Sequence, residues 1–190
     1  KEKRPTKNKP DQAVTYKPDQ VVAYKTVENT DKSADELDLN IFRPPGDQAE
    51  GNLPCVVFFF GGGWNGGSPS QFYPHCRYFA SRGMVAISAE YRTKTSHNVT
   101  PKSCVADGKS AVRWVRANAK RLGIDPQRIA VGGGSAGGHL AAATGLISGL
   151  DEPGEDPSIS SMPNAMVLFN PAAALAPFDG SPPLDTERTT

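Results

Sequence analysis

The stretch that decides the fold runs from residue 128 to residue 144 and reads RIAVGGGSAGGHLAAAT. An apolar segment typical of a buried strand leads into Gly-x-Ser-x-Gly at residues 133–137, and an alanine-rich segment typical of a helix follows. A strand that turns into a helix within about one residue strains the turn residue, and flanking glycines leave room for the chains to pass. The pattern predicts a nucleophile elbow that presents the Ser135 hydroxyl; the alternative interpretation is a plain tight turn.

A second glycine cluster lies upstream. Residues 55–60, CVVFFF, are continuously apolar, which is typical of a strand buried on both faces of a parallel sheet, and they end in three glycines. Backbone without Cβ atoms can approach a substrate carbonyl closely. The N–H groups of Gly62 and Gly63 are therefore predicted to form an oxyanion hole with the N–H of Ala136, at the start of the helix. A flexible loop is the alternative, although Trp64 and Pro69 favour a loop of defined shape.

Three further motifs accompany the elbow and the glycine loop: Glu90-Tyr-Arg92 at a strand end, Pro101 and Asp107 ahead of AVRWV, and GIDPQRI leading into the elbow strand. With them the sequence resembles the alpha/beta-hydrolase esterases, in the branch of the hormone-sensitive-lipase-like and the acetyl or feruloyl esterases. The resemblance extends from about residue 21 to the end. It implies hydrolysis of carboxylic esters through an acyl-enzyme on Ser135.

The sequence departs from the family pattern at two positions. Family members usually have His-Gly-Gly-Gly where this chain has Phe60 before the glycines, so any hydrogen bond of that histidine must be absent or replaced. The residue before the serine, commonly acidic, is Gly134 here. Neither change removes a group that the reaction consumes.

A serine nucleophile needs a positioned base, and the family places an acid and then a histidine after the serine. The histidines of this sequence are His75, His97 and His139. His139 lies one helical turn after Ser135 on the flank of its own helix, which makes it a poor base. His75 is interpreted as a helix-surface residue. His97, in a polar loop over residues 93–100, is a candidate substrate contact.

The missing acid and histidine suggest a chain that lacks roughly the last third of the fold. Asp179 and Asp185 lie in a polar tail and are poor candidates for the acid. We expect residues 1–20 to form a disordered tail and residues 21–190 to form the first two-thirds of an alpha/beta-hydrolase domain. The expected fold is α/β: a mostly parallel sheet with helices on both faces, an antiparallel N-terminal hairpin, and its last strands missing.

The order of predicted elements supports this fold class. Apolar segments and turn signals predict strands near residues 55–60, 84–89, 128–132 and 165–170, separated by helices near 72–81, 105–119 and 138–144. Such alternation calls for a parallel sheet covered on both faces. Residues 21–27 and 36–42 are predicted to pair as the hairpin, and Asp125-Pro126 is predicted to be a turn.

Composition excludes several classes of protein. The 190 residues carry a net charge of +1, with 37% hydrophobic and 22% charged residues, so neither global disorder nor a nucleic-acid surface is indicated. The sequence contains no run of about 18 apolar residues, so it indicates no membrane-spanning helix. Cys55, Cys76 and Cys104 lack metal-ligand spacing; a Cys76–Cys104 disulfide is left open.

Two other functions are weighed. Residues 61–66 and 132–137 each satisfy Gly-x-Gly-x-x-Gly, and Glu90 follows the first at a strand end, as in a dinucleotide-binding Rossmann domain. Against this, Gly66-Gly-Ser-Pro69 prevents a helix from starting at the third glycine, where a pyrophosphate needs it. A non-catalytic hydrolase-fold binding protein is disfavoured while Ser135 and both oxyanion elements are present.

The ligand is expected to be a small-molecule or carbohydrate ester. Trp64 and the loop over residues 65–71 suit a flat sugar or aromatic group, so Trp64 is a second candidate substrate contact, and short acyl esters on carbohydrate are the preferred substrates. No cofactor and no metal are expected, and the sequence leaves the oligomeric state open.

Overall fold

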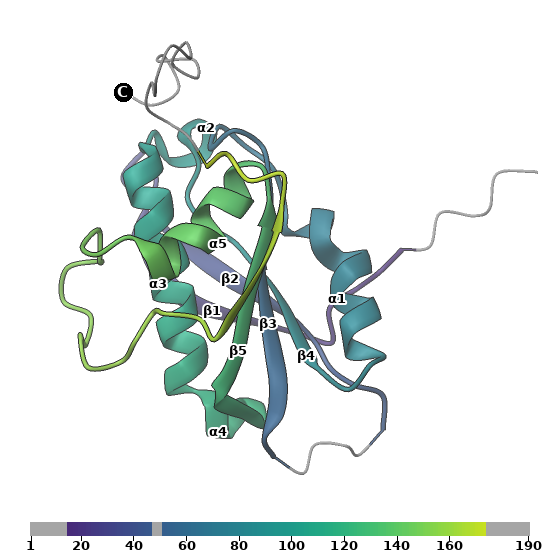
Figure 1. Ribbon diagram of the computed structural model, residues 1–190. Coiled ribbons are helices and arrows are strands. Elements are labelled where there is room, and N and C mark those ends of the chain that lie inside the picture. Colours follow the sequence, from purple (N-terminus) through teal and green to yellow (C-terminus); the bar gives the residue numbers. More distant parts are fainter. Residues whose placement is uncertain (1–14, 47–50, 174–190) are drawn as a thin grey trace, which may run out of the picture.

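The computed structural model describes residues 15–46 and 51–173. The strands of this part are β1 Gln20–Glu28, β2 Ala34–Phe42, β3 Leu53–Phe59, β4 Val85–Ala89, β5 Ile124–Gly134 and β6 Ala165–Phe169. The helices are the 3-10 helix η1 Pro69–Phe72 and the α-helices α1 Tyr73–Ala80, α2 Lys94–His97, α3 Pro101–Ala117, α4 Ala119–Leu122 and α5 Ala136–Leu146. The predicted strand and helix alternation is confirmed from β3 to β6 (Figure 1).

The strands form one sheet in the order β1-β2-β4-β3-β5-β6. The predicted hairpin is confirmed, because β1 pairs with β2 antiparallel, and β2 then pairs antiparallel with β4. The pairs β3–β4, β3–β5 and β5–β6 are parallel. The carboxyl ends of β3 and β5 therefore lie side by side, which brings the glycine loop next to the elbow.

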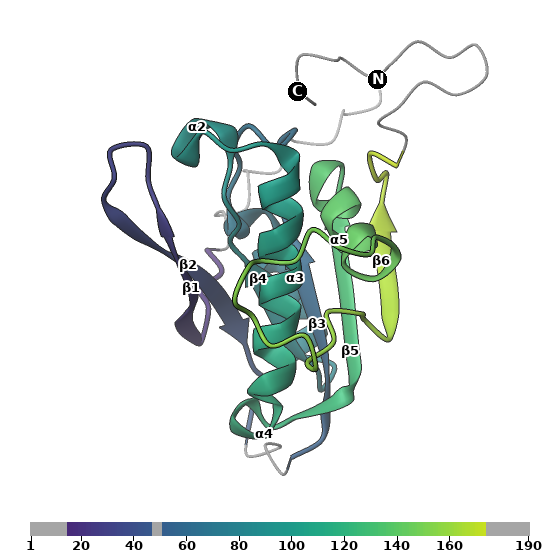
Figure 2. The ribbon, with the colours of Figure 1, turned by 90° about the vertical axis from the view of Figure 1, so that its left-hand side faces the viewer.

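Helices cover both faces of the sheet. The helix α1 lies on one face, and α3 and α5 lie on the other (Figure 1; turned in Figure 2). The central strands between these layers are apolar and buried, with Val57, Phe58 and Ile87 fully enclosed. Burial on both faces explains why these strands read as continuous apolar runs rather than alternating ones.

The cysteines belong to these layers. Cys76 lies on α1 and Cys104 on α3, so the sheet separates the two thiols, and both are free, as is Cys55. The disulfide that the sequence left open is therefore not formed. Burial raises the pKa of the Cys55 and Cys104 thiols to about 12, which keeps them protonated.

Two predicted loops contain regular structure instead. The predicted turn at Asp125-Pro126 lies within the span of β5: Leu53 pairs with Ile124 and Cys55 with Ile129, and the Gln127 N–H donates to the Asp125 carboxylate at 2.8 Å in the irregular stretch between them. The polar loop over residues 93–100 contains the single helical turn α2, because the Thr93 side chain caps it and Asn98 closes it in the left-handed conformation.

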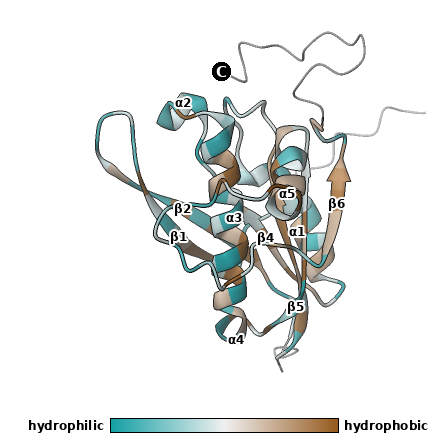
Figure 3. Cartoon of the chain, turned by 60° about the vertical axis from the view of Figure 1, so that its left-hand side comes forward, coloured by the Kyte–Doolittle hydropathy of each residue, from teal (hydrophilic) through white to brown (hydrophobic). Residues whose placement is uncertain are grey.

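The N-terminal boundary and the sheet edge complete the fold. Residues 1–14 of the expected tail lie outside the described residues, whereas Asp19 already pairs with Arg77 and β1 begins at Gln20. At the opposite edge, β6 is a hydrophobic strand (Figure 3), and its residues Val167, Leu168 and Phe169 are exposed. Within the described residues, no helix is long and apolar enough to cross a membrane.

Candidate active site

Ser135 sits at the sharp turn between β5 and α5. Its backbone has φ 53° and ψ −118°, a conformation that residues other than glycine rarely adopt, and the residue is exposed. Neighbouring backbone holds the turn: Ser135 N–H donates to the Phe169 carbonyl at 3.0 Å, and the Ser135 carbonyl accepts from Ala172 N–H at 3.1 Å. The predicted elbow geometry is therefore present, with strand, strained serine and helix in direct succession.

The glycines around Ser135 are required by close packing. A Cβ atom on Gly133 would lie 2.4 Å from the Gly137 carbonyl oxygen, and one on Gly137 would lie 2.1 Å from the carbonyl oxygen of Phe59. The elbow thus presses against the end of β3. A Cβ atom on Gly61 would likewise lie 2.8 Å from the carbonyl oxygen of Gly134, so the glycine loop starts in contact with the elbow.

The backbone N–H groups proposed for the oxyanion hole have no acceptor in the part of the chain that the structure describes. Gly62 and Gly63 have φ values of 143° and 62°, and no hydrogen bond joins either N–H group to another described residue. Ala136 is the first residue of α5, where a helix leaves its N–H groups without an internal partner. These three donors, together with the positive end of the helix dipole, suit a negatively charged oxygen beside Ser135. Their assignment to one oxyanion stays a prediction.

Phe60 occupies the place of the family's histidine. Its ring stacks on Tyr91, with centroids 4.1 Å apart, and the Tyr91 hydroxyl donates to the Phe60 carbonyl at 2.7 Å. The same ring lies against Gly67, where an added Cβ would approach its Cδ2 atom to 2.4 Å. Aromatic packing from Phe60 therefore fills the space beneath the glycine loop.

Trp64 and His139 pack together beside the elbow. The indole is 6% exposed, and its ring meets the His139 ring edge-on with centroids 5.4 Å apart. Trp64 Nε1 and His139 Nδ1 are both buried without a hydrogen-bond partner among the described residues. Burial lowers the pKa of the His139 imidazole, so that ring is neutral near pH 7.

His97 faces away from the elbow toward the hairpin. Its ring is 6% exposed, and its Nε2 atom lies 3.2 Å from the Asp35 carboxylate on β2. Both residues line a cavity of about 160 Å³ behind the glycine loop, together with Phe60 and Tyr91. The role of His97 as a substrate contact stays a prediction, and the structure places little of its ring at the surface.

A base for Ser135 is not found in the part of the chain that the structure describes. No hydrogen bond joins the Ser135 hydroxyl to a histidine within residues 15–46 and 51–173. His75 is exposed on α1, as predicted, with its ring 5.8 Å from that of Phe169. Asp179 and Asp185 lie outside the described residues. Residues 15–46 and 51–173 contain no group of three or more His, Cys, Asp or Glu side chains placed to hold a metal ion.

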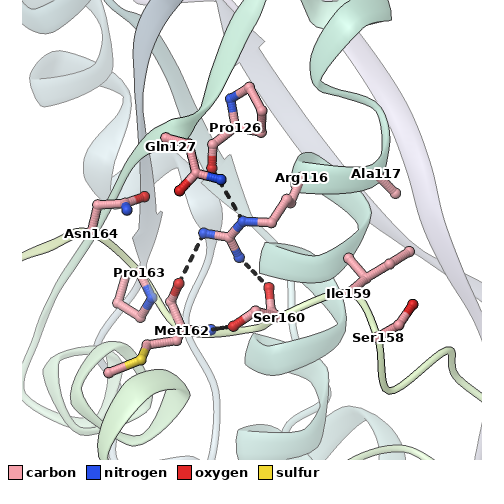
Figure 4. Close-up of a pocket in the computed structure, with 10 residues that line it drawn as sticks. All are labelled: Arg116, Ala117, Pro126, Gln127, Ser158, Ile159, Ser160, Met162, Pro163 and Asn164. Atoms are coloured by element: carbon pink, nitrogen blue, oxygen red, sulfur yellow. Dashed lines mark hydrogen bonds between the residues drawn. The ribbon is translucent and has the colours of Figure 1, made fainter.

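A cavity of about 510 Å³ lies at the other end of β5. Pro126 and Gln127 at the start of that strand line it, whereas Ser135 follows the strand's carboxyl end. The Arg116 guanidinium donates there to the carbonyls of Pro126, Ser160 and Met162, and so ties the loop before β6 to α3 (Figure 4). Ligands of open parallel sheets bind at the carboxyl ends of strands, so this cavity is not the candidate site.

The dinucleotide alternative does not fit this geometry. After the glycines at residues 61–63 the chain forms a loop, and the first helical turn begins only at Pro69. A pyrophosphate would therefore find no helix N-terminus at Gly66, the third glycine of that cluster. In the second cluster α5 does begin beside Gly137, but the acidic residues that follow, Asp151 and Asp156, lie in the loop before β6 and not at a strand end.

The elbow, the glycine loop and the strand order define an alpha/beta hydrolase of the esterase type. The BD-FAE family model matches residues 39–169, more than half of the chain, and the chain belongs to this family. The match includes β3, the glycine loop, the elbow and β6.

Individual relatives agree with the family. The chain is 37% identical to the carboxylesterase NlhH of Mycobacterium tuberculosis over 56% of its own length and 33% of that protein. It is 33% identical to the fumonisin B1 esterase of Sphingopyxis macrogoltabida over 76% of its length and 28% of that protein. Among solved structures, the apo form of Thermogutta terrifontis esterase 2 superposes with a TM-score of 0.81 at 49% identity, covering 90% of this chain and 62% of that one. The chain thus spans about a third of the length of NlhH and of the fumonisin B1 esterase.

Sequence reasoning missed the residues that hold the glycine loop in place. Gln71 accepts a hydrogen bond from Gly61 N–H at 2.6 Å, and α2 donates from Lys94 N–H to the Trp64 carbonyl at 2.8 Å. The sequence indicates Tyr91 only as part of the Glu90-Tyr-Arg92 motif. A glutamine after Pro69-Ser70 carries no pattern that would reveal this contact.

Proposed function

We propose that the protein hydrolyses carboxylic esters through an acyl-enzyme on Ser135. One observation carries this proposal: a strained, exposed serine at a strand-to-helix turn lies beside a glycine loop in which the N–H groups of Gly62 and Gly63 donate to no described residue. The backbone strain at Ser135 costs stability, which favours a functional role for this turn over a purely structural one. The esterase names of the relatives support the same activity.

The reaction follows from the geometry. The Ser135 oxygen bonds to the acyl carbon while a base takes its proton, and the carbonyl oxygen becomes an oxyanion that accepts from the N–H groups of Gly62, Gly63 and Ala136. The bond to the alcohol then breaks, and the base returns the proton to that oxygen. Water repeats the sequence on the acyl-enzyme. The acid and the histidine are proposed to come from the part of the relatives' length that this chain does not span.

Short acyl esters are the proposed substrates. Structures of Thermogutta terrifontis esterase 2 exist with propionate and with butyrate bound; they match this chain at 51% and 48% identity over 56% and 62% of their own lengths. A carbohydrate as the alcohol portion is the finer proposal; it rests on the loop over residues 65–71, since the Trp64 indole is buried against His139 and its contact with substrate stays a prediction. Comparing acetylated sugars with p-nitrophenyl acetate tests that part separately.

Covalent labelling tests the nucleophile directly. The esterase 2 structures include forms phosphonylated by sarin and by cyclosarin, so a fluorophosphonate probe is the matched reagent. We expect the whole protein to take up one probe per chain, and mass spectrometry to find it on the peptide that contains Ser135. Labelling of another residue, or ester hydrolysis by protein that resists the probe, would contradict the assignment.

The glycine loop yields a second expected result. Gly63→Val places a branched side chain at φ 62° in the proposed oxyanion hole, and we expect kcat to fall by about 10²–10³. Phe60→His keeps an aromatic ring under the loop and should change kcat by less than about tenfold. Steady-state kinetics of folded variants checks both, and a Gly63→Val enzyme with the parent rate would remove the loop from the oxyanion hole.

A further inference from the structure

One peptide unit at the entrance of the glycine loop is held at both of its polar atoms. The carbonyl of Phe60 accepts from the Tyr91 hydroxyl at 2.7 Å, and the N–H of Gly61 donates to the Gln71 side chain at 2.6 Å. These two groups belong to the same peptide plane, because the carbonyl of one residue and the N–H of the next share one C–N bond. Tyr91 and Gln71 therefore fix the orientation of a single plane.

The holding groups come from different parts of the fold. Tyr91 follows β4 and is 3% exposed, and Gln71 lies on η1. Burial raises the pKa of the Tyr91 hydroxyl well above its ordinary value, which keeps it a donor over the working pH range. Stacking of the Tyr91 ring on Phe60 fixes the direction of that donor.

The far end of the loop is held as well. Lys94 N–H donates to the Trp64 carbonyl at 2.8 Å, and Thr95 N–H donates to the Asn65 carbonyl at 3.0 Å. Between these attachments lie Gly62 and Gly63, whose N–H groups donate to no residue within 15–46 and 51–173. Glycine has the widest choice of backbone conformations, so the aim of these two donors depends on the planes that flank them.

We propose that Gln71 and Tyr91 act as a clamp on the Phe60–Gly61 peptide plane and are positioning residues for the oxyanion hole. The two hydrogen bonds hold the start of the loop in a chain that has Phe60 before its glycines. This inference rests on the proposed esterase function, since the oxyanion must exist for its donors to need aiming. Neither side chain touches the substrate in this role.

A clamp predicts loss of transition-state stabilisation without loss of substrate binding. Tyr91→Phe removes only the hydroxyl and keeps the stacked ring, and Gln71→Met removes the acceptor at similar side-chain length. We expect each variant of the whole protein to lower kcat by about tenfold for p-nitrophenyl butyrate, with KM changed less than twofold. Affinity for a trifluoromethyl ketone analogue of that ester should fall by the same factor as kcat/KM.

Non-additivity tests the shared plane. Both hydrogen bonds are needed to fix the orientation of one peptide plane, so removing either one already produces most of the effect. The double variant should therefore lower kcat by about 10- to 20-fold rather than by about 100-fold. Gln127→Met, an exposed glutamine at the other end of β5, is the matched control and should keep the parent kcat. Full fluorophosphonate labelling of the clamp variants would show that the nucleophile is intact whatever happens to the clamp. Single variants with parent kcat, or a multiplicative double variant, would overturn the proposal.

Discussion

Ser135→Ala is expected to lower kcat/KM for a short p-nitrophenyl ester by about 10⁴ or more. The substitution removes the oxygen that would bond to the acyl carbon, and only binding and the oxyanion donors would contribute to the residual rate. Stability should change little, because the serine side chain is exposed and makes no cap hydrogen bond at the start of α5. Initial-rate kinetics and a denaturant melt of the whole protein measure both quantities.

The control and the competing interpretation are both accessible. Ser158→Ala changes an exposed serine at the far end of the molecule and should leave the rate unaltered. A non-catalytic protein of this fold would show no turnover before substitution. A folded Ser135→Ala variant that turns over at the parent rate would refute the nucleophile assignment.

Local sequence signals predicted most of the fold. The apolar segment before Ser135 and the small residues after it define β5 and α5, because strand-to-helix reversal demands glycines at fixed offsets. The run CVVFFF predicted β3 as a doubly buried strand, and the alternation in residues 36–42 predicted the paired hairpin strand β2. These elements are encoded by short-range periodicity, which sequence reasoning reads well.

The parts that sequence reasoning missed depend on contacts between distant residues. Gln71 reaches Gly61 only because η1 folds back beneath the loop, and His97 meets Asp35 only because the sheet brings β2 beside the end of β4. The register shift between β3 and β5, from Leu53–Ile124 to Cys55–Ile129, likewise depends on the pairing of two distant strands. The glycines themselves predict the loop and its N–H donors, but nothing in the sequence beside them indicates that the Gln71 and Tyr91 side chains hold it.

A buried ion network connects the hairpin to the helical layer and to the residues beside the clamp. Asp107 on α3 is fully buried and accepts from Lys25 Nζ at 2.6 Å and from Arg92 through Nε at 2.9 Å and its backbone N–H at 3.0 Å. Glu152 pairs with the same two cations at 2.5 and 3.0 Å. Burial opposes the charge of Arg92, but the two carboxylates outweigh it and raise the pKa of the guanidinium.

Asp107→Ala is therefore expected to lower the free energy of unfolding by about 3–5 kcal/mol, because it leaves two half-buried cations sharing one carboxylate. Equilibrium unfolding in urea measures the change, and Lys32→Ala, which breaks an exposed pair with Glu28, should cost far less. Asp107→Ala should also lower kcat. It removes the carboxylate that accepts from the Arg92 backbone N–H, and Arg92 directly follows Tyr91. A stability loss below about 1 kcal/mol would mean that the network contributes no net stabilisation, as some buried ion pairs do not.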